Sequence, residues 1–146
     1  MIALIQRVSE ARVDVDGVTL GAIDAGLLAL IGVQPGDGEA QTQRLLERML
    51  GYRIFADAEG RMNRSLADVG GGLLLVSQFT LAADTRSGMR PGFSTAAAPV
   101  EAEHWFKRLL ELARMRHAGV ETGRFGAHMK VHLVNDGPVT FRLETN

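Results

Sequence analysis

Hydrophobic and polar residues along the first third of the chain alternate, or run together, in short blocks that predict strands. Residues 2–8 form one such block. Residues 12–15 alternate strictly, and Asp16-Gly17 is a dipeptide typical of a type I′ hairpin turn before a returning strand at 18–20. Residues 26–33 are apolar on both faces, which is typical of a buried strand.

The same reading predicts further strands later in the chain. A short one is expected at 53–55, and a strongly apolar one at 73–77 follows three consecutive glycines. Two more are expected at 127–134 and 139–143, joined by the polar, turn-like residues 135–138.

Helical periodicity occurs in two places. Leucines and methionines spaced three and four apart predict a helix over residues 39–52, with Asp37 as its N-cap. Pro99 suits the first turn of a second helix, which we expect to end near His117. Strands outnumber helices and mostly follow one another directly, so the pattern favours a single α+β domain over residues 1–146, with a largely antiparallel or mixed sheet and two main helices.

Composition narrows the possible chemistry. The 146 residues are 46% hydrophobic and carry a net charge of −1, so no broad basic surface indicates a nucleic-acid-binding protein. The absence of cysteine excludes disulfides, thiol catalysis and thiolate metal sites. No apolar run has the length of a membrane span or a signal peptide, so we expect a cytoplasmic protein without membrane contacts.

The most informative local feature is the point where the strand at 73–77 meets a long irregular segment, residues 78–98. Ser77, Gln78, Phe79 and Thr80 lie there, and exposed backbone N–H groups at such a turn can stabilise an oxyanion. The plainer interpretation is that both hydroxyls cap the strand end. No Gly-x-Ser-x-Gly motif indicates an ordinary serine hydrolase.

Other residues give weaker indications of a functional site. His128 and His132 are four residues apart, but they alternate with apolar residues and flank Lys130, so we expect a polar strand face and no metal site. Arg86 and Arg90 could join them in a small phosphate-contacting patch. Gly137-Pro138 is either a plain turn or a cis bond that presents both carbonyls.

Together, these segments resemble the D-aminoacyl-tRNA deacylase family. The blocks that carry the resemblance are residues 1–8, 50–55, 57–60, 76–85, 88–91, 122–127 and 133–141. Gly92, His128 and His132 depart from the family pattern, all outside its two signature blocks, Ser-Gln-Phe-Thr and Asn-Asp-Gly-Pro-Val-Thr.

The resemblance implies a barrel-like sheet and a homodimer in which Ser77, Gln78, Phe79 and Thr80 of one subunit face Gly137 and Pro138 of the other. It further implies that Arg7 holds the Gly137-Pro138 turn in place and that Phe125 and Met129 form the walls of an adenosine pocket. The implied substrate is D-aminoacyl-tRNA, including mischarged glycyl-tRNA. Backbone N–H groups and the 2′-hydroxyl of the tRNA would perform the hydrolysis without a cofactor.

Two other functions are compatible with the same residues. One is an esterase that uses Thr80 or Ser77 as a nucleophile. The other is a non-catalytic RNA-binding module of the same fold.

Overall fold

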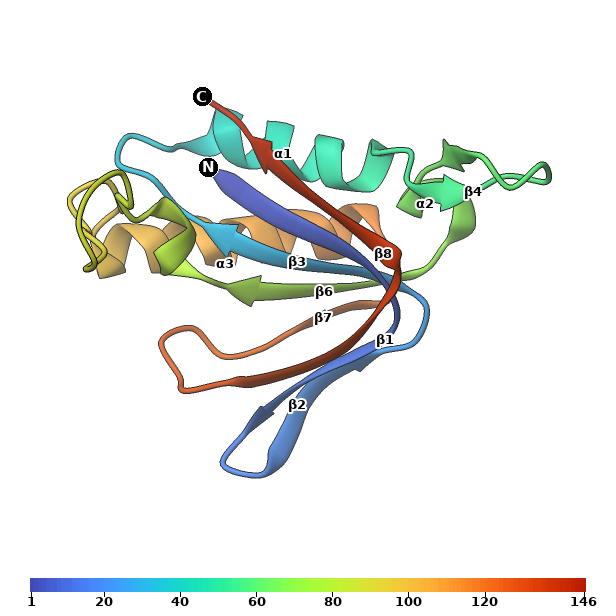
Figure 1. Ribbon diagram of the computed structural model, residues 1–146, viewed down its shortest axis with the longest axis horizontal. Coiled ribbons are helices and arrows are strands. Elements are labelled where there is room, and N and C mark those ends of the chain that lie inside the picture. Colours follow the sequence, from blue (N-terminus) through green and yellow to red (C-terminus); the bar gives the residue numbers. More distant parts are fainter.

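A twisted sheet with two long helices on one of its faces makes up the molecule, which a computed structural model describes over residues 1–146 (Figure 1). The strands of the main sheet are β1 (Ile2–Val15), β2 (Val18–Ile23), β3 (Gly26–Gly32), β6 (Gly72–Ser77), β7 (Val120–Thr122) and β8 (Lys130–Glu144). The helices are α1 (Glu39–Gly51), α2 (Leu66–Val69) and α3 (Pro99–Arg116), with a 3-10 turn, η1 (Phe79–Ala82). A small hairpin, β4 (Phe55–Ala56) and β5 (Met62–Arg64), projects from one side.

The sheet is mixed and curls almost shut, so the predicted α+β class and barrel-like shape are confirmed. Its strand order is β2-β1-β3-β6-β7, with β8 on β1. Pairing is antiparallel around β1 and parallel between β3, β6 and β7. A Cβ added to Gly21 of β2 would lie 2.6 Å from the Thr122 carbonyl oxygen of β7, so the two edges nearly meet.

Two pairs of predicted strands are single strands in the structure. Residues 2–8 and 12–15 both belong to β1, whose pairing with β8 continues past a register shift between Val8 and Glu10. The other pair, 127–134 and 139–143, falls in β8, which begins only at Lys130. The predicted turn at 135–138 is wrong, because these residues form a bulge inside β8. Between the pairs Gln6–Thr140 and Val8–Asn135, β1 has one intervening residue and β8 has four.

The predicted N-cap of α1 is also wrong. Gly38 occupies that position, and the buried Asp37 carboxylate instead accepts hydrogen bonds from the Met1 ammonium (2.7 Å) and the Gln34 backbone N–H (2.7 Å). A buried positive charge requires such a partner, and this requirement takes precedence over capping. The strand expected at 53–55 is β4, which begins two residues later and ends one residue later than predicted.

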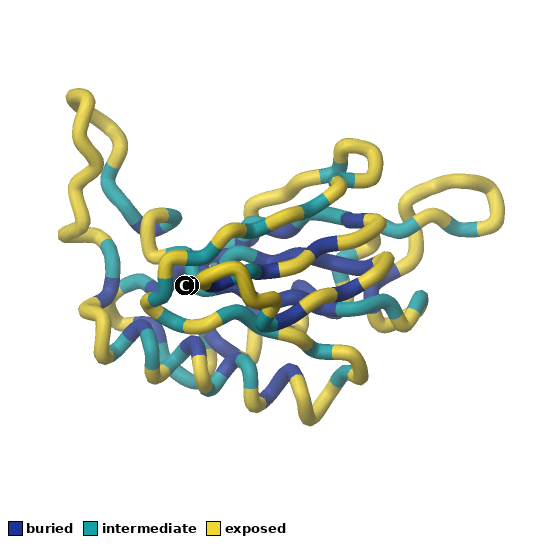
Figure 2. Tube along the Cα trace, turned by 90° about the horizontal axis from the view of Figure 1, so that it is seen from below, coloured by how far each residue is buried: buried dark blue, intermediate teal, exposed yellow.

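The hydrophobic core lies on both faces of the sheet. The larger cluster fills the space between the sheet and helices α1 and α3, and a smaller one lines the concave face under β1 and β8. Burial follows the strands and the inner helix faces, while the connecting loops are largely exposed (Figure 2). None of the helices is both long and apolar enough to span a bilayer.

Candidate functional site

Ser77, Gln78, Phe79 and Thr80, the strand-end segment, form the end of β6 and the start of η1. The Gln78 N–H donates to the Ile31 carbonyl (2.7 Å), which holds the segment to β3. The first hydrogen bond of η1 runs from the Leu81 N–H to the Gln78 carbonyl (3.2 Å). The N–H groups of Phe79 and Thr80 precede it and therefore have no partner within the turn.

The hydroxyls of this segment have no general base beside them. Thr80 Oγ1 accepts a hydrogen bond from the side-chain amide of Gln78, and neither Ser77 nor Thr80 is hydrogen-bonded to a histidine or a carboxylate. The predicted residues are therefore close together, but their arrangement is not that of a nucleophile with its base.

Aromatic and apolar side chains surround the strand-end segment. The Phe79 side chain, 54% exposed, packs against Phe93 with ring centroids 5.2 Å apart. Phe93 was not predicted, since nothing in the irregular segment 78–98 distinguished it. The loop between β7 and β8, which carries Phe125 and Met129, reaches the same end of the sheet (Figure 1).

Gly137 and Pro138, the Gly-Pro segment, lie in the β8 bulge and are joined by a cis peptide bond. Gly137 has φ +148°, and a Cβ there would lie 2.6 Å from Val139 Cγ2, so only glycine fits. The Arg7 guanidinium donates from Nε to the Asp136 carbonyl (2.8 Å) and from Nη1 to the Ile54 carbonyl (2.7 Å).

Asn135 closes the base of the bulge. Its Oδ1 accepts from the Val139 N–H (2.7 Å), and its Nδ2 donates to Thr140 Oγ1 (2.9 Å). With Arg7 on one side and Asn135 on the other, the Gly-Pro segment is held by side chains while its own two residues stay exposed.

The strand-end segment and the Gly-Pro segment lie at opposite ends of the sheet. The Gly-Pro segment is beside Arg7, which is in register with Leu27 of β3 and, through it, with Leu73 of β6. Ser77 is four residues farther along β6, about 13 Å at ~3.3 Å per residue. One chain therefore does not bring the two predicted halves of the site together (Figure 1).

The charged candidates are dispersed. Arg86 donates to both carboxylate oxygens of Asp84 (2.9 and 2.7 Å), which lowers the pKa of Asp84 to about 2 and offsets the charge of Arg86. His132 lies 3.2 Å from Asp14, and His128 is exposed. No three side chains among His, Asp and Glu gather as metal ligands.

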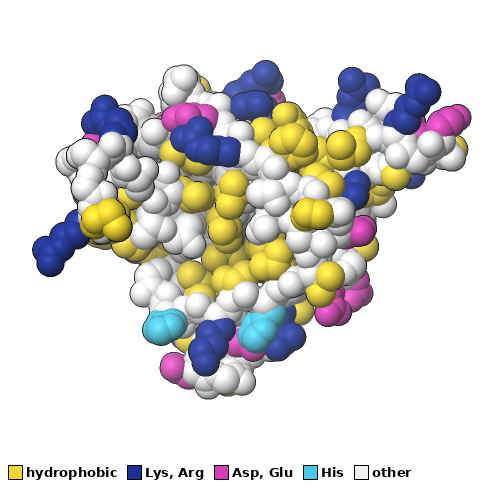
Figure 3. Space-filling view, viewed as in Figure 1, with side chains coloured by type: hydrophobic (Ala, Val, Ile, Leu, Met, Phe, Trp, Pro, Cys, Tyr) yellow, Lys and Arg dark blue, Asp and Glu magenta, His cyan; other side chains and the backbone are white.

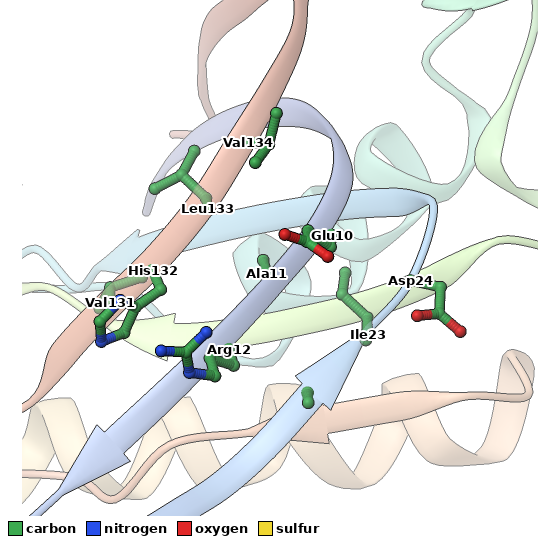
Figure 4. Close-up of a pocket in the computed structure, with 10 residues that line it drawn as sticks. Glu10, Ala11, Arg12, Ile23, Asp24, Val131, His132, Leu133 and Val134 are labelled. Atoms are coloured by element: carbon green, nitrogen blue, oxygen red, sulfur yellow. The ribbon is translucent and has the colours of Figure 1, made fainter. Parts of the chain in front are cut away.

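A cavity of about 540 Å³ lies between β1, β2 and β8, away from the strand-end and Gly-Pro segments (Figure 4). Glu10, Arg12 and His132 contribute its polar wall, and Ile23 and Leu133 part of its apolar wall. Of the candidate residues, only His132 lines it.

Known proteins match the chain over its whole length. A profile described as D-Tyr-tRNA(Tyr) deacylase matches residues 4–144. A relative from Stenotrophomonas maltophilia (strain K279a), named D-aminoacyl-tRNA deacylase, is 69% identical over 98% of this chain and 99% of its own. One of the same name from Pseudomonas paraeruginosa (strain DSM 24068 / PA7) is 65% identical over 99% of both chains.

Solved structures also resemble this chain over its length. One titled "c-Myc DNA Unwinding Element Binding Protein" superposes with a TM-score of 0.96 at 36% identity, covering 100% of this chain and 99% of that one. Another, titled as a probable eukaryotic D-amino acid tRNA deacylase, has a TM-score of 0.77 at 16% identity, covers 99% of this chain and 98% of its own, and shares the fold. These matches make the chain an enzyme of the hydrolase class. It belongs to the D-Tyr-tRNA(Tyr) deacylase family.

Proposed function

We propose that the protein hydrolyses the ester between a D-amino acid and the 3′-terminal adenosine of tRNA, and leaves L-aminoacyl-tRNA intact. The observation that carries this proposal is the strand-end segment. It offers two backbone N–H groups without a partner in η1, at Phe79 and Thr80, and no nucleophile paired with a base. Such a site suits an ester that is already activated, because stabilising the tetrahedral oxyanion is then the main requirement.

The chemistry needs only water and the substrate. The oxygen of a positioned water attacks the ester carbonyl, and the 2′-hydroxyl of the terminal ribose assists the loss of its proton. The N–H groups of Phe79 and Thr80 hold the developing oxyanion. When the carbon–oxygen bond breaks, the ribose 3′-oxygen takes up a proton and the free amino acid leaves. No cofactor or metal takes part.

A second copy of the chain completes the site. The Gly-Pro segment is exposed and lies about 13 Å along the sheet from the strand-end segment of its own chain. In a two-fold dimer the same pair of surfaces meets twice, so each Gly-Pro segment can face the partner's strand-end segment. The contacts of Arg7 and Asn135 support this, since they fix a protruding segment that would otherwise move.

The Gly-Pro segment would distinguish D from L substrates by steric exclusion of the L side chain. We expect the carbonyl groups of the Gly-Pro segment to accept from the substrate ammonium, so that an L side chain would collide with that backbone while a D side chain points to solvent. No pocket has to fit each D side chain, and glycine, with no side chain, is also accepted. Phe125 and Met129 would form the walls of the adenosine pocket. The expected partner is tRNA in the cytoplasm.

The test is deacylation of D-tyrosyl-tRNA against L-tyrosyl-tRNA by the purified protein, with and without a chelator. We expect turnover of the D ester alone, unaffected by chelation. Turnover of both esters would exclude the chiral gate. Binding of both without turnover would indicate the non-catalytic RNA-binding module instead.

A further inference from the structure

A second open pocket lies at the end of α1, beside the β4–β5 hairpin. Its volume is about 420 Å³. The residues that line it, here called the Tyr52 pocket, are Gly51, Tyr52, Arg53, Ile54, Met62 and Phe141. None of them is acidic. In Figure 3, hydrophobic side chains gather in this region, between β8 and the hairpin, with basic side chains near them.

Exposed aromatic surface is the main feature of the Tyr52 pocket. The rings of Tyr52 and Phe141 meet edge to face, with centroids 5.6 Å apart. The Phe141 side chain remains 37% exposed and that of Met62 49% exposed. This chain therefore leaves apolar surface at Phe141 and Met62 exposed, and a planar ring could stack on the exposed aromatic ring.

The charge around the Tyr52 pocket is positive. Arg53 is exposed and takes part in none of the ion pairs, and the Arg48 guanidinium lies 5.9 Å from the centre of the Tyr52 ring. The Ser65 N–H (2.8 Å) and, more weakly, the charge of Arg53 lower the pKa of the Asp68 carboxylate, so one acidic group lies within reach of the positive charge of Arg53. An anionic ligand with a planar ring fits both properties.

The Tyr52 pocket is connected directly to the Gly-Pro segment. The Ile54 carbonyl, in the wall of the pocket, accepts from Arg7 Nη1, and Arg7 Nε holds the carbonyl of Asp136. The pocket therefore borders the segment against which we expect the substrate ester to lie.

We propose that the Tyr52 pocket binds an unpaired nucleobase of the tRNA 3′ end, upstream of the terminal adenosine. This inference rests on the proposed function. The base stacks on Phe141 and Tyr52, as bases of single strands do on aromatic side chains. Arg53 contacts the adjoining phosphate. In the proposed dimer, the pocket of one subunit serves the substrate whose ester lies in the partner's strand-end segment.

The experiment compares two substrates that differ only in the nucleotides upstream of the adenosine. D-tyrosyl-tRNA contains them, and the D-tyrosyl ester of adenosine does not. We expect Phe141→Ser and Arg53→Glu each to raise KM for D-tyrosyl-tRNA about tenfold, the loss expected when a stacked base or a phosphate contact is removed. Hydrolysis of the adenosine ester should stay as in the wild type. Arg116→Glu, an exposed charge reversal at the far end of α3, is the matched control and should change neither.

Each of four outcomes would overturn the inference. Equal effects of Arg53→Glu on both substrates would mean that the pocket does not read upstream nucleotides. A change in sedimentation of Arg53→Glu or Phe141→Ser would mean that a second copy of the chain covers the pocket. If the wild type hydrolyses neither substrate, the proposed function itself fails. If the wild type hydrolyses both substrates and the variants keep the wild-type KM, the role of the Tyr52 pocket is contradicted while the proposed function stands.

Discussion

At the scale of single residues, the candidate site offers backbone N–H groups and no side-chain nucleophile paired with a base. The N–H groups of Phe79 and Thr80 are fixed by the Gln78 N–H bond to β3, not by the identity of either side chain. The Thr80 hydroxyl is engaged by Gln78 and has no base. A substitution of Thr80 can therefore distinguish catalysis by the backbone N–H groups from catalysis by a Thr80 nucleophile.

If the backbone N–H groups carry the oxyanion, Thr80→Ala keeps them. We expect its single-turnover rate on D-tyrosyl-tRNA to fall by less than about 100-fold, whereas removal of a nucleophile costs about 10⁴–10⁶-fold. The wild type should be nearly inactive on a substrate ending in 2′-deoxyadenosine. A folded but inactive Thr80→Ala protein, together with full turnover of the deoxy substrate, would restore the protein nucleophile.

At the scale of elements, the sequence predicts structure where periodicity is long enough to be read. The alternation in β1 and β2, the apolar blocks of β3 and β6 and the helical spacing of α1 and α3 identify those elements. The short elements α2, β5 and β7 have four residues or fewer and carry no usable period. The continuity of β8 could not be predicted, because a bulge and a turn use the same residue types.

The parallel pairing of β3 with β6 depends on a close approach of two glycines. A Cβ on Gly26 would overlap the Gly72 carbonyl oxygen, which is backbone and cannot move aside. We therefore expect Gly26→Ala to lower the free energy of unfolding by at least about 2 kcal/mol, measured by urea denaturation. Gly51→Ala, at the end of α1 with nothing within 4 Å of the added Cβ, is the control and should be neutral or stabilising.

An ion pair ties the first turn of α1 to α3. Arg108 donates to Glu39 from Nε and Nη2 (2.9 Å each), and these bonds lower the pKa of Glu39 from 4.5 to about 2. Because the pKa is lower in the folded protein, the pair stabilises above pH 4.5 and loses its effect as the pH falls towards 2. Glu39→Gln should thus lower Tm at pH 7, with the difference vanishing near pH 2.

Calorimetry across this pH range checks the assignment. Glu47→Gln, which removes an exposed pair with Arg44 (3.1 Å), should change Tm little at any pH. A Tm difference for Glu39→Gln that persists at pH 2 would show that Glu39 acts through packing and not through its charge.

At the scale of the whole molecule, the fold places the strand-end and Gly-Pro segments apart within one chain, and the sequence analysis had assigned them to one site built from two subunits. The family resemblance supplied the candidate residues, but strand register decides where they lie, and register depends on pairings between distant segments. For the same reason no sequence pattern indicated the Tyr52 pocket, whose two aromatic residues, Tyr52 and Phe141, come from opposite halves of the chain. The catalytic and binding roles of the site residues remain predictions.

The distance between the strand-end segment and the Gly-Pro segment has a consequence for genetics. If each site takes one segment from each subunit, two inactive alleles can rescue one another. A chain inactivated only in its strand-end segment and a chain inactivated only in its Gly-Pro segment would, when unfolded and refolded together, form mixed dimers in which one site inherits both defects and the other inherits none. Random pairing makes half of the dimers mixed, so about a quarter of wild-type activity should return. No recovery, despite mixed dimers detected by mass spectrometry, would mean that each chain builds its site alone.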